Sequence, residues 1–105
     1  MVNVRLKLPL FLCGLLALST SRSVLAADID QGKLLYERFC SRCHGVDGYR
    51  VLPQAADLAR GEGLLRSNRQ LRERLEAGKG VCPSYRGLMK DRDFTNLIMY
   101  IRTLR

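Results

Sequence analysis

Two cysteines and the only histidine of the chain lie within five consecutive residues. Cys40, Cys43 and His44 stand in the stretch FCSRCHG and form the pattern Cys-x-x-Cys-His. Thiols at this spacing can form thioethers with the two vinyl groups on one edge of a haem, and the histidine that follows can bind the iron. We therefore expect one covalently bound haem c, with His44 as an axial ligand of the iron.

Two other kinds of site use part of this pattern. A thioredoxin-like redox pair has the same cysteine spacing but lies in a βαβ unit, and no alternating strand pattern surrounds Cys40 and Cys43. A zinc ion could take its four ligands from Cys40, Cys43, His44 and Cys82. Adjacent side chains such as those of Cys43 and His44 suit a closed tetrahedral site poorly, so zinc is the weaker interpretation.

The beginning of the chain has the features of a secretory signal. Arg5 and Lys7 precede an apolar run over residues 8–18, and a polar patch then leads to the small-residue stretch VLAA. We place cleavage after Ala26, with Ala27 as the alternative. The apolar run is too short for a membrane-spanning helix, which needs about 20 residues. A retained N-terminal anchor is therefore the weaker interpretation, and we expect a periplasmic protein.

Cleavage of this leader changes the number of cysteines that remain. The leader contains Cys13, and the bulky Phe11 and Leu12 before it are unlike the small residues that precede a lipid-modified cysteine. Exported proteins usually pair their cysteines in disulfides, but three cysteines remain and cannot all pair. A haem attachment site accounts for two of them.

Residues 27–105 form a chain of 79 residues, which is enough for one small domain. A core of this size rarely contributes more than about 3–5 kcal/mol to the stability of the fold, so we expect a bound cofactor to stabilise it.

Three of the 18 Lys and Arg residues lie in the leader and all ten acidic residues follow it, which leaves residues 27–105 with a formal charge of +5. This charge favours acidic partners. No cluster of aromatic and basic residues accompanies it, so we expect no nucleic-acid binding.

Three segments have the patterns of helices. Asp28, with Gln31 three residues on, predicts the start of a helix over residues 29–39. Ser67 and Gln70 have the spacing of a capping box, which predicts a helix over residues 68–77. The expected apolar face of the first helix consists of Ile29, Leu34, Leu35 and Phe39, and that of the middle helix of Leu71 and Leu75, before a stop at Gly78.

The last helix is the most clearly periodic segment. Asp91 is its expected cap, and apolar side chains recur with helical spacing at Phe94, Leu97, Ile98, Ile101 and Leu104. Between Gly45 and Gly63 we expect a loop with one short turn. These patterns predict an all-α fold.

These stretches resemble the class I cytochromes c, the small bacterial proteins with one haem. GKLLYERFCSRCHG is similar to their first helix, with Gly32 and Tyr36 ahead of the attachment motif. LMKDRDFTNLIMYIRTLR is similar to their last helix, with Tyr100 at the usual aromatic position. The resemblance covers about residues 29–104. It implies a cytochrome c fold of three to four helices around one covalently bound haem, in which the first and last helices cross closely at Gly32.

The resemblance also implies the surroundings of the iron. A proline after the motif supplies its carbonyl to the axial histidine, and Pro53 occupies that place and would hold His44. The family's second iron ligand is a methionine before a proline, but here GKGV is followed by Cys82 and Pro83. We therefore expect the thiolate of Cys82 as second axial ligand, because a metal-bound thiol is deprotonated and a strong donor. In the alternative, Cys82 is a small buried side chain, and Met89 or no side chain binds the iron.

The function that the resemblance implies is the transfer of single electrons by an exported protein, without catalytic residues. Its partners would be redox proteins with acidic docking faces, it would be a monomer or a subunit of a redox complex, and any membrane association would be loose. Tyr49, Arg50 and Arg60 are candidates for contact with the haem carboxylates. The alternative is a haem subunit or sensor that acts on sulfur compounds or small gaseous ligands, and a zinc-stabilised interaction domain would be colourless.

Overall fold

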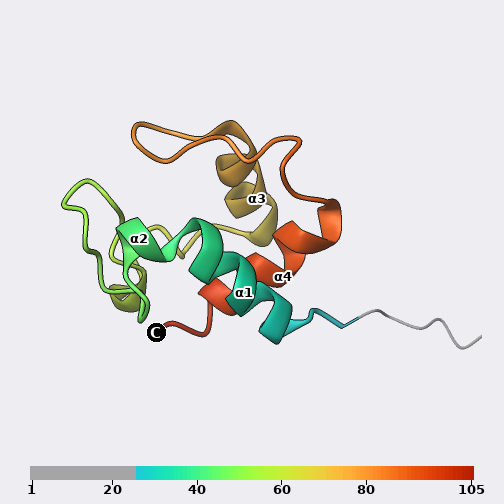
Figure 1. Cartoon of the computed structure of the whole chain (residues 1–105), viewed down its shortest axis with the longest axis horizontal. Coiled ribbons are helices and arrows are strands. Elements are labelled where there is room, and N and C mark those ends of the chain that lie inside the picture. The colour runs from blue at the N-terminus through green and yellow to red at the C-terminus, as the bar shows by residue number, and fades with distance from the viewer. Residues whose placement is uncertain (1–25) are drawn as a thin grey trace, which may run out of the picture.

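The computed structural model describes residues 26–105, which contain four α-helices, one 3-10 helix and no strand (Figure 1). The helices are α1 (Ile29–Phe39), α2 (Ser41–His44), η1 (Leu58–Arg60), α3 (Asn68–Ala77) and α4 (Asp91–Ile101). The all-α fold is therefore confirmed, and η1 is the short turn expected between Gly45 and Gly63. The predicted leader falls, apart from Ala26, outside the described residues.

Helix α1 begins as the sequence predicts but buries a different face. The side chain of Asp28 caps it by accepting a hydrogen bond from the Gln31 backbone N–H at 3.0 Å. Tyr36 is fully buried, whereas Leu34 is 57% exposed and Ile29 is 38% exposed. The prediction that Ile29 and Leu34 belong to the buried face is therefore wrong. Gly32 and Tyr36 instead form the side of α1 that contacts α4.

The crossing of α1 and α4 is the main helix contact of the fold (Figure 1). A Cβ atom on Gly32 would collide with the carbonyl oxygen of Asn96, so only glycine permits this approach. The rings of Tyr36 and Tyr100 pack with their centroids 5.4 Å apart. The predicted close crossing at Gly32 is thereby confirmed. The side chains that α4 buries are Phe94, Asn96, Leu97, Ile98 and Ile101.

The start of α4 differs from the prediction. Lys90 is the residue that precedes the helix, and its backbone N–H donates to Oδ2 of Asp93 at 2.9 Å. Asp91 is already helical, and its carboxylate instead accepts a hydrogen bond from Arg72 on α3. The prediction of Asp91 as the cap is therefore wrong. Asp93 caps the helix because a side chain at the third helical position can reach back to the free N–H.

Helix α3 has the predicted capping box and the predicted end. The Ser67 hydroxyl accepts from the Gln70 N–H at 3.2 Å, and Gln70 Oε1 accepts from the Ser67 N–H at 2.9 Å. Gly78 follows the helix with a φ of 70°. Arg72 joins α3 to α4, because its guanidinium pairs with Asp91 at the start of α4. It also pairs with Glu76 one turn further along α3. Within residues 26–105, no helix has the length and apolar character that a membrane span requires.

Candidate haem site

The chemically distinctive residues meet at one cavity of about 640 Å³. Cys40, Cys43 and His44 line it from the end of α1 and from α2, and Cys82 lines it from the loop that joins α3 to α4. Figure 1 shows this loop passing above α2. Residues almost 40 positions apart in the sequence therefore share one site, as the motif and the position of Cys82 predict.

The end of α1 places the two cysteines of the motif. The helix closes with a hydrogen bond from the Cys40 N–H to the Tyr36 carbonyl at 2.8 Å, and α2 then carries Cys43 and His44. The Tyr36 hydroxyl donates to the buried carbonyl of Gly45 at 2.6 Å, which fixes the far end of α2. Burial raises the pKa of the Cys40 thiol to about 12, with the neighbouring cysteine thiols adding to the effect.

The imidazole of His44 is held by a backbone carbonyl, but not by the predicted one. Its Nδ1 atom lies 2.8 Å from the carbonyl oxygen of Ala56. Because a carbonyl only accepts, Nδ1 carries the proton and Nε2 keeps its lone pair. Pro53 lines the cavity, but its predicted contact with His44 is wrong. A turn closed by the Ala55 N–H and the Leu52 carbonyl, at 2.9 Å, separates Pro53 from the carbonyl that is used.

A tight turn presents Cys82. The backbones of Lys79 and Cys82 exchange two hydrogen bonds of 2.9 and 3.0 Å around Gly80, which has a φ of 57°. Such a two-residue turn favours glycine at its first central position. The Cys82 side chain is half-buried, and the hydrogen bond found for its sulfur is a long one of 3.9 Å to the Pro83 carbonyl. The thiol therefore faces the cavity with its bonding capacity largely unused.

Tyr85 fixes this loop to two helices. Its backbone N–H donates to the Leu75 carbonyl of α3 at 3.0 Å, and its hydroxyl donates to the Phe39 carbonyl of α1 at 3.0 Å. The rings of Tyr85 and Phe39 also pack edge to face, with centroids 5.7 Å apart. Burial raises the pKa of the Tyr85 phenol to about 12. These contacts hold the wall that carries Cys82 against the wall that carries the Cys-x-x-Cys-His motif.

The structure does not bring a methionine to the cavity. Met89 is buried in the same hydrophobic cluster as Phe94 and Leu97, and it is not among the residues that line the cavity. Met99 lies on α4 near Asn68, and it does not line the cavity either. Of the two residues considered for the second ligand, Cys82 lies at the site and Met89 does not.

Charged side chains at the cavity fit the carboxylates of a haem. The Nη1 atom of Arg74 is buried and has no hydrogen-bond partner among the described residues, and Arg74 lines the cavity. A buried guanidinium N–H without an acceptor is costly, and a haem carboxylate would supply that acceptor. Of the candidates from the sequence, Arg50 lines the cavity and pairs with Glu62 at 3.5 Å. Neither Tyr49 nor Arg60 lines it.

Sequence reasoning missed Arg74, although a signal was present. Arg74 follows Leu71 by three residues and precedes Leu75, so it shares the apolar face of α3. A cation on the buried face of a helix indicates an anionic partner.

The competing kinds of site lack support in the structure. Residues 26–105 contain no group of three or more His, Cys, Asp or Glu side chains placed to share a metal ion, so the zinc interpretation is wrong. No disulfide joins the three cysteines in this range. Because the same range contains no strand, the βαβ unit of a thioredoxin-like pair is also absent from it.

Comparison with known proteins decides the family. The family described as cytochrome c oxidase, cbb3-type, subunit III matches residues 27–101. The chain belongs to this family of c-type cytochromes. It is also similar to a cytochrome c6 from Gracilaria tenuistipitata var. liui, with 27% identity over 78 residues that cover 72% of each chain. No solved structure matches the chain significantly.

Family membership settles the cofactor and the general role. As a c-type cytochrome, the chain carries covalently bound haem c and transfers electrons between redox partners. The haem supplies the one-electron chemistry of its iron. The protein supplies attachment through thiols, an imidazole held in one tautomer by Ala56, and the apolar walls of the cavity.

Proposed function

We propose that this cytochrome is an exported, class I type electron carrier whose haem iron is bound by His44 and by the thiolate of Cys82. The observation that carries the proposal is that both side chains line one cavity. His44 lines it from α2 with Nε2 free, and Cys82 lines it from the loop between α3 and α4 as the only thiol outside the attachment motif within residues 26–105.

The surroundings of Cys82 support ligation over simple packing. A cysteine that acts only as a small apolar side chain is normally fully buried, whereas Cys82 is half-buried at the cavity wall. The turn between Lys79 and Cys82 and the two hydrogen bonds of Tyr85 determine where its sulfur lies. A preorganised donor of this kind loses little conformational freedom when it binds a metal.

A thiolate ligand has a definite consequence for the electron that is carried. An anionic sulfur stabilises ferric iron more than a neutral thioether does, so it lowers the reduction potential. The cytochrome would therefore give up electrons more readily than relatives with a methionine ligand.

The proposal includes processing and location. Residues 1–26 are proposed to direct export and to be removed, which leaves residues 27–105 as one cytochrome domain in the periplasm. Redox partners with acidic surfaces are proposed from the formal charge of +5 of that domain. Salt should slow electron exchange with such partners, since the Debye length falls to about 8 Å near physiological ionic strength.

The ligand assignment is tested by absorption and electron paramagnetic resonance spectra of the oxidised protein. We expect low-spin ferric iron with a thiolate-type resonance signal. Cys82→Ala should give high-spin or water-bound iron and a ferrous form that binds carbon monoxide. Cys82→Met should introduce the near-infrared band of a methionine–iron bond and raise the potential, within the roughly 0.8 V range that axial ligands control.

Met89→Leu is the matched control, because it removes the other sulfur considered while conserving core volume, at a cost of less than about 1.5 kcal/mol. Its spectra should equal those of the wild type. A wild-type methionine band, together with unchanged spectra in Cys82→Ala, would show that Cys82 is ordinary packing. The alternative role with sulfur compounds or gases predicts instead that thiosulfate, sulfide or nitric oxide changes the wild-type spectrum at low concentration.

A further inference from the structure

One peptide group in the loop between α2 and η1 joins the imidazole of His44 to a carboxylate. The carbonyl oxygen of Ala56 accepts the hydrogen bond of His44 Nδ1–H at 2.8 Å. The N–H of the same peptide group, which belongs to Asp57, donates to Oε2 of Glu62 at 2.8 Å. The two hydrogen bonds therefore lie at opposite ends of one planar amide, which we call the 56–57 peptide group.

The backbone around η1 fixes the position of Glu62. The N–H groups of Arg60 and Glu62 both donate to the carbonyl of Asp57, at 3.2 and 3.1 Å. Gly61, between them, has a φ of 81° and turns the chain back toward Asp57. Glu62 thus binds Asp57 twice, once through its backbone N–H and once through its side chain. This ring of hydrogen bonds holds the carboxylate against the 56–57 peptide group.

The charge of Glu62 is only partly compensated by a cation. Nη1 of Arg50 lies 3.5 Å from the same Oε2 atom that lies 2.8 Å from the Asp57 nitrogen. The side chains of Arg50 and Glu62 are 44% and 46% exposed, so water screens this ion pair. The hydrogen bond from the Asp57 N–H is partly buried. The shorter and less exposed contact of the carboxylate is therefore the one to the peptide group.

A hydrogen bond to an anion polarises an amide. A charge-assisted hydrogen bond is roughly twice as strong as a neutral one, and hydrogen bonds in a chain strengthen one another. Resonance moves electron density from the nitrogen of a peptide group to its oxygen, so a carboxylate at the N–H makes the carbonyl oxygen more negative. A stronger acceptor at Nδ1 in turn raises the basicity of a metal-binding imidazole.

We infer that Glu62 is a positioning residue for the imidazole of His44. Through the 56–57 peptide group, its carboxylate strengthens the hydrogen bond at Nδ1 and with it the electron donation from Nε2 to the iron. Greater donation stabilises ferric iron, so Glu62 lowers the reduction potential. The inference rests on the ligation by His44 in the proposed function, and it does not depend on the second ligand.

A purely structural role for Glu62 is the alternative, because a side chain that only satisfies the Asp57 N–H would make the same contact. Glu62→Gln separates the two roles, since glutamine keeps an acceptor oxygen and loses the charge. Asp57→Asn is the matched control, because it removes a carboxylate charge next to the same peptide group. Oδ1 of Asp57 is buried without a hydrogen-bond partner among the described residues, and Oδ2 lies 3.5 Å from Nε of Arg60. This carboxylate therefore takes no part in the two hydrogen bonds.

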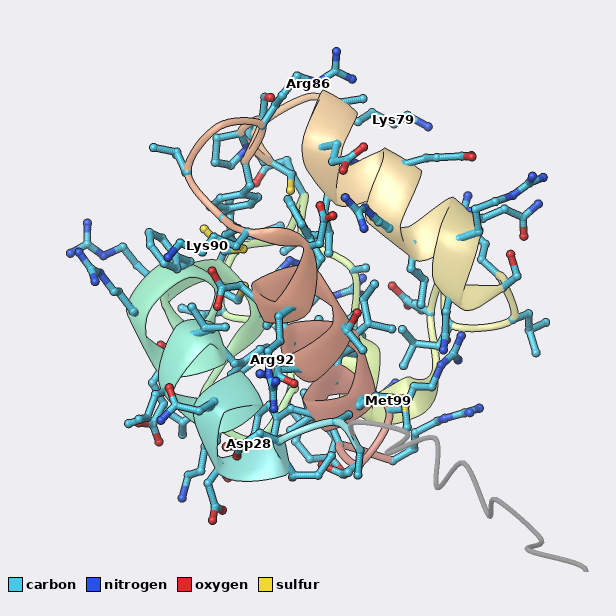
Figure 2. The ribbon with its side chains drawn as sticks, turned by 90° about the vertical axis from the view of Figure 1, so that its right-hand side faces the viewer. Asp28, Lys79, Arg86, Lys90, Arg92 and Met99 are labelled. Carbon is cyan, nitrogen blue, oxygen red and sulfur yellow. The ribbon has the colours of Figure 1, made fainter. Side chains whose placement is uncertain are left out.

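A second pair of variants tests the opposite sign. Arg50→Gln removes the cation beside Oε2 of Glu62 and should strengthen the hydrogen bond at Nδ1. Arg92→Gln removes one exposed cation at the start of α4 and is its matched control. In Figure 1, η1 and the start of α4 lie on opposite sides of the molecule, and Figure 2 shows Arg92 from the side of α4. Arg92 is therefore remote from the 56–57 peptide group.

The measurement is nuclear magnetic resonance of the ferrous, haem-loaded protein with isotope-labelled histidine, under carbon monoxide. Carbon monoxide keeps the iron low-spin and diamagnetic whichever side chain is the sixth ligand. His44 is the only histidine of the chain, so its ring N–H is assigned without ambiguity. We expect the Nδ1 proton to move upfield in Glu62→Gln, to move downfield in Arg50→Gln and to stay in place in both controls.

Voltammetry without carbon monoxide measures the consequence for the electron. We expect Glu62→Gln to raise the equilibrium constant for reduction by about threefold or more, where tenfold corresponds to about 59 mV for one electron. If Glu62→Gln does not fold, the sign of the shift in Arg50→Gln decides, and an upfield or absent shift there would count against the inference.

An Nδ1 proton that stays in place in folded Glu62→Gln would overturn the inference. With an unchanged potential the role of Glu62 would be structural, and with a raised potential its charge would act on the haem through space. An equal upfield movement in Asp57→Asn would overturn it as well. Upfield ring-current shifts of the carbon-bound protons of His44 report ligation itself. If the wild type lacks them, the proposed ligation fails, whereas their presence with an unmoved Nδ1 proton refutes only the role of Glu62.

Discussion

Two glycines on either side of Lys79 allow the position of Cys82 to be tested without altering the sulfur. Gly78 and Gly80 have φ angles of 70° and 57°, so alanine is strained at either position. The two sites differ in the space around them. A Cβ atom on Gly78 would lie 2.7 Å from the Ser84 nitrogen and 2.9 Å from the Cys82 carbonyl oxygen. A Cβ atom on Gly80 would have no neighbour within 4 Å.

The expected losses follow from this difference. Alanine in a left-handed conformation costs roughly 1–2 kcal/mol, which applies to both variants. Crowding of a packed backbone adds about 1–3 kcal/mol, which applies only to Gly78→Ala. The crowded atoms belong to the backbone of Cys82 and its neighbours, so relief requires that backbone to move. Gly78→Ala should therefore weaken the proposed bond between Cys82 and the iron as well as the fold.

Denaturant unfolding of both haem-loaded variants measures the stability, and ferric spectra report the ligand. We expect Gly78→Ala to be less stable than Gly80→Ala by about 1–3 kcal/mol, and to contain a high-spin fraction that Gly80→Ala lacks. Equal stabilities with identical low-spin spectra would refute the reasoning, because the contacts around Gly78 would then not position Cys82.

Three further expectations concern other parts of the site. Arg74→Gln should lower the reduction potential more than Arg69→Gln, since a buried cation favours the less positive ferrous state more than an exposed one does; voltammetry measures both. Tyr36→Phe should cost about 1–3 kcal/mol at neutral pH, because a buried carbonyl loses its donor. Burial raises the pKa of Tyr36 above its ordinary value, so wild-type stability should fall above about pH 10, whereas urea unfolding of the variant should show a flatter pH profile. Replacing Cys40 and Cys43 together by Ala should leave a colourless chain without a cooperative thermal transition, and a transition near the wild-type temperature would contradict this.

Features that depend on neighbouring residues could be predicted from the sequence. The capping box of Ser67 and Gln70 and the cap at Asp28 use side chains three residues from the backbone groups they bind. The Cys-x-x-Cys-His motif is likewise a local pattern. Gly32 was predictable only through the resemblance, because the glycine itself does not say which helix approaches it.

Features that depend on the orientation of a helix or loop could not be predicted in this way. Residues Ile29 and Leu34 are apolar but exposed, because the contact with α4 selects the side of Gly32 and Tyr36. Asp91 has the composition of a cap, yet Asp93 takes that role. Both positions are acidic and lie in the first turn, and only the backbone geometry distinguishes them.

The contact of His44 shows the same limit at the site itself. Pro53 and Ala56 are three residues apart in one loop, and any residue there offers a carbonyl oxygen. The choice depends on how the loop turns after Leu52, whose N–H donates to the Cys43 carbonyl at 3.0 Å. The type of residue carries no information about which carbonyl faces the imidazole, because every residue has the same backbone carbonyl group.

The approach of Cys82 to the motif depends on longer-range contacts still. Its loop is 38 residues from His44, and the hydrogen bonds of Tyr85 to Leu75 and Phe39 bring it back to the end of α1. The Ser84 hydroxyl, which donates to the Glu76 carbonyl, adds a second link between this loop and α3. Tyr85 therefore connects sequence to function here: it turns a cysteine that the sequence marks only as unusual into a side chain that faces the haem cavity.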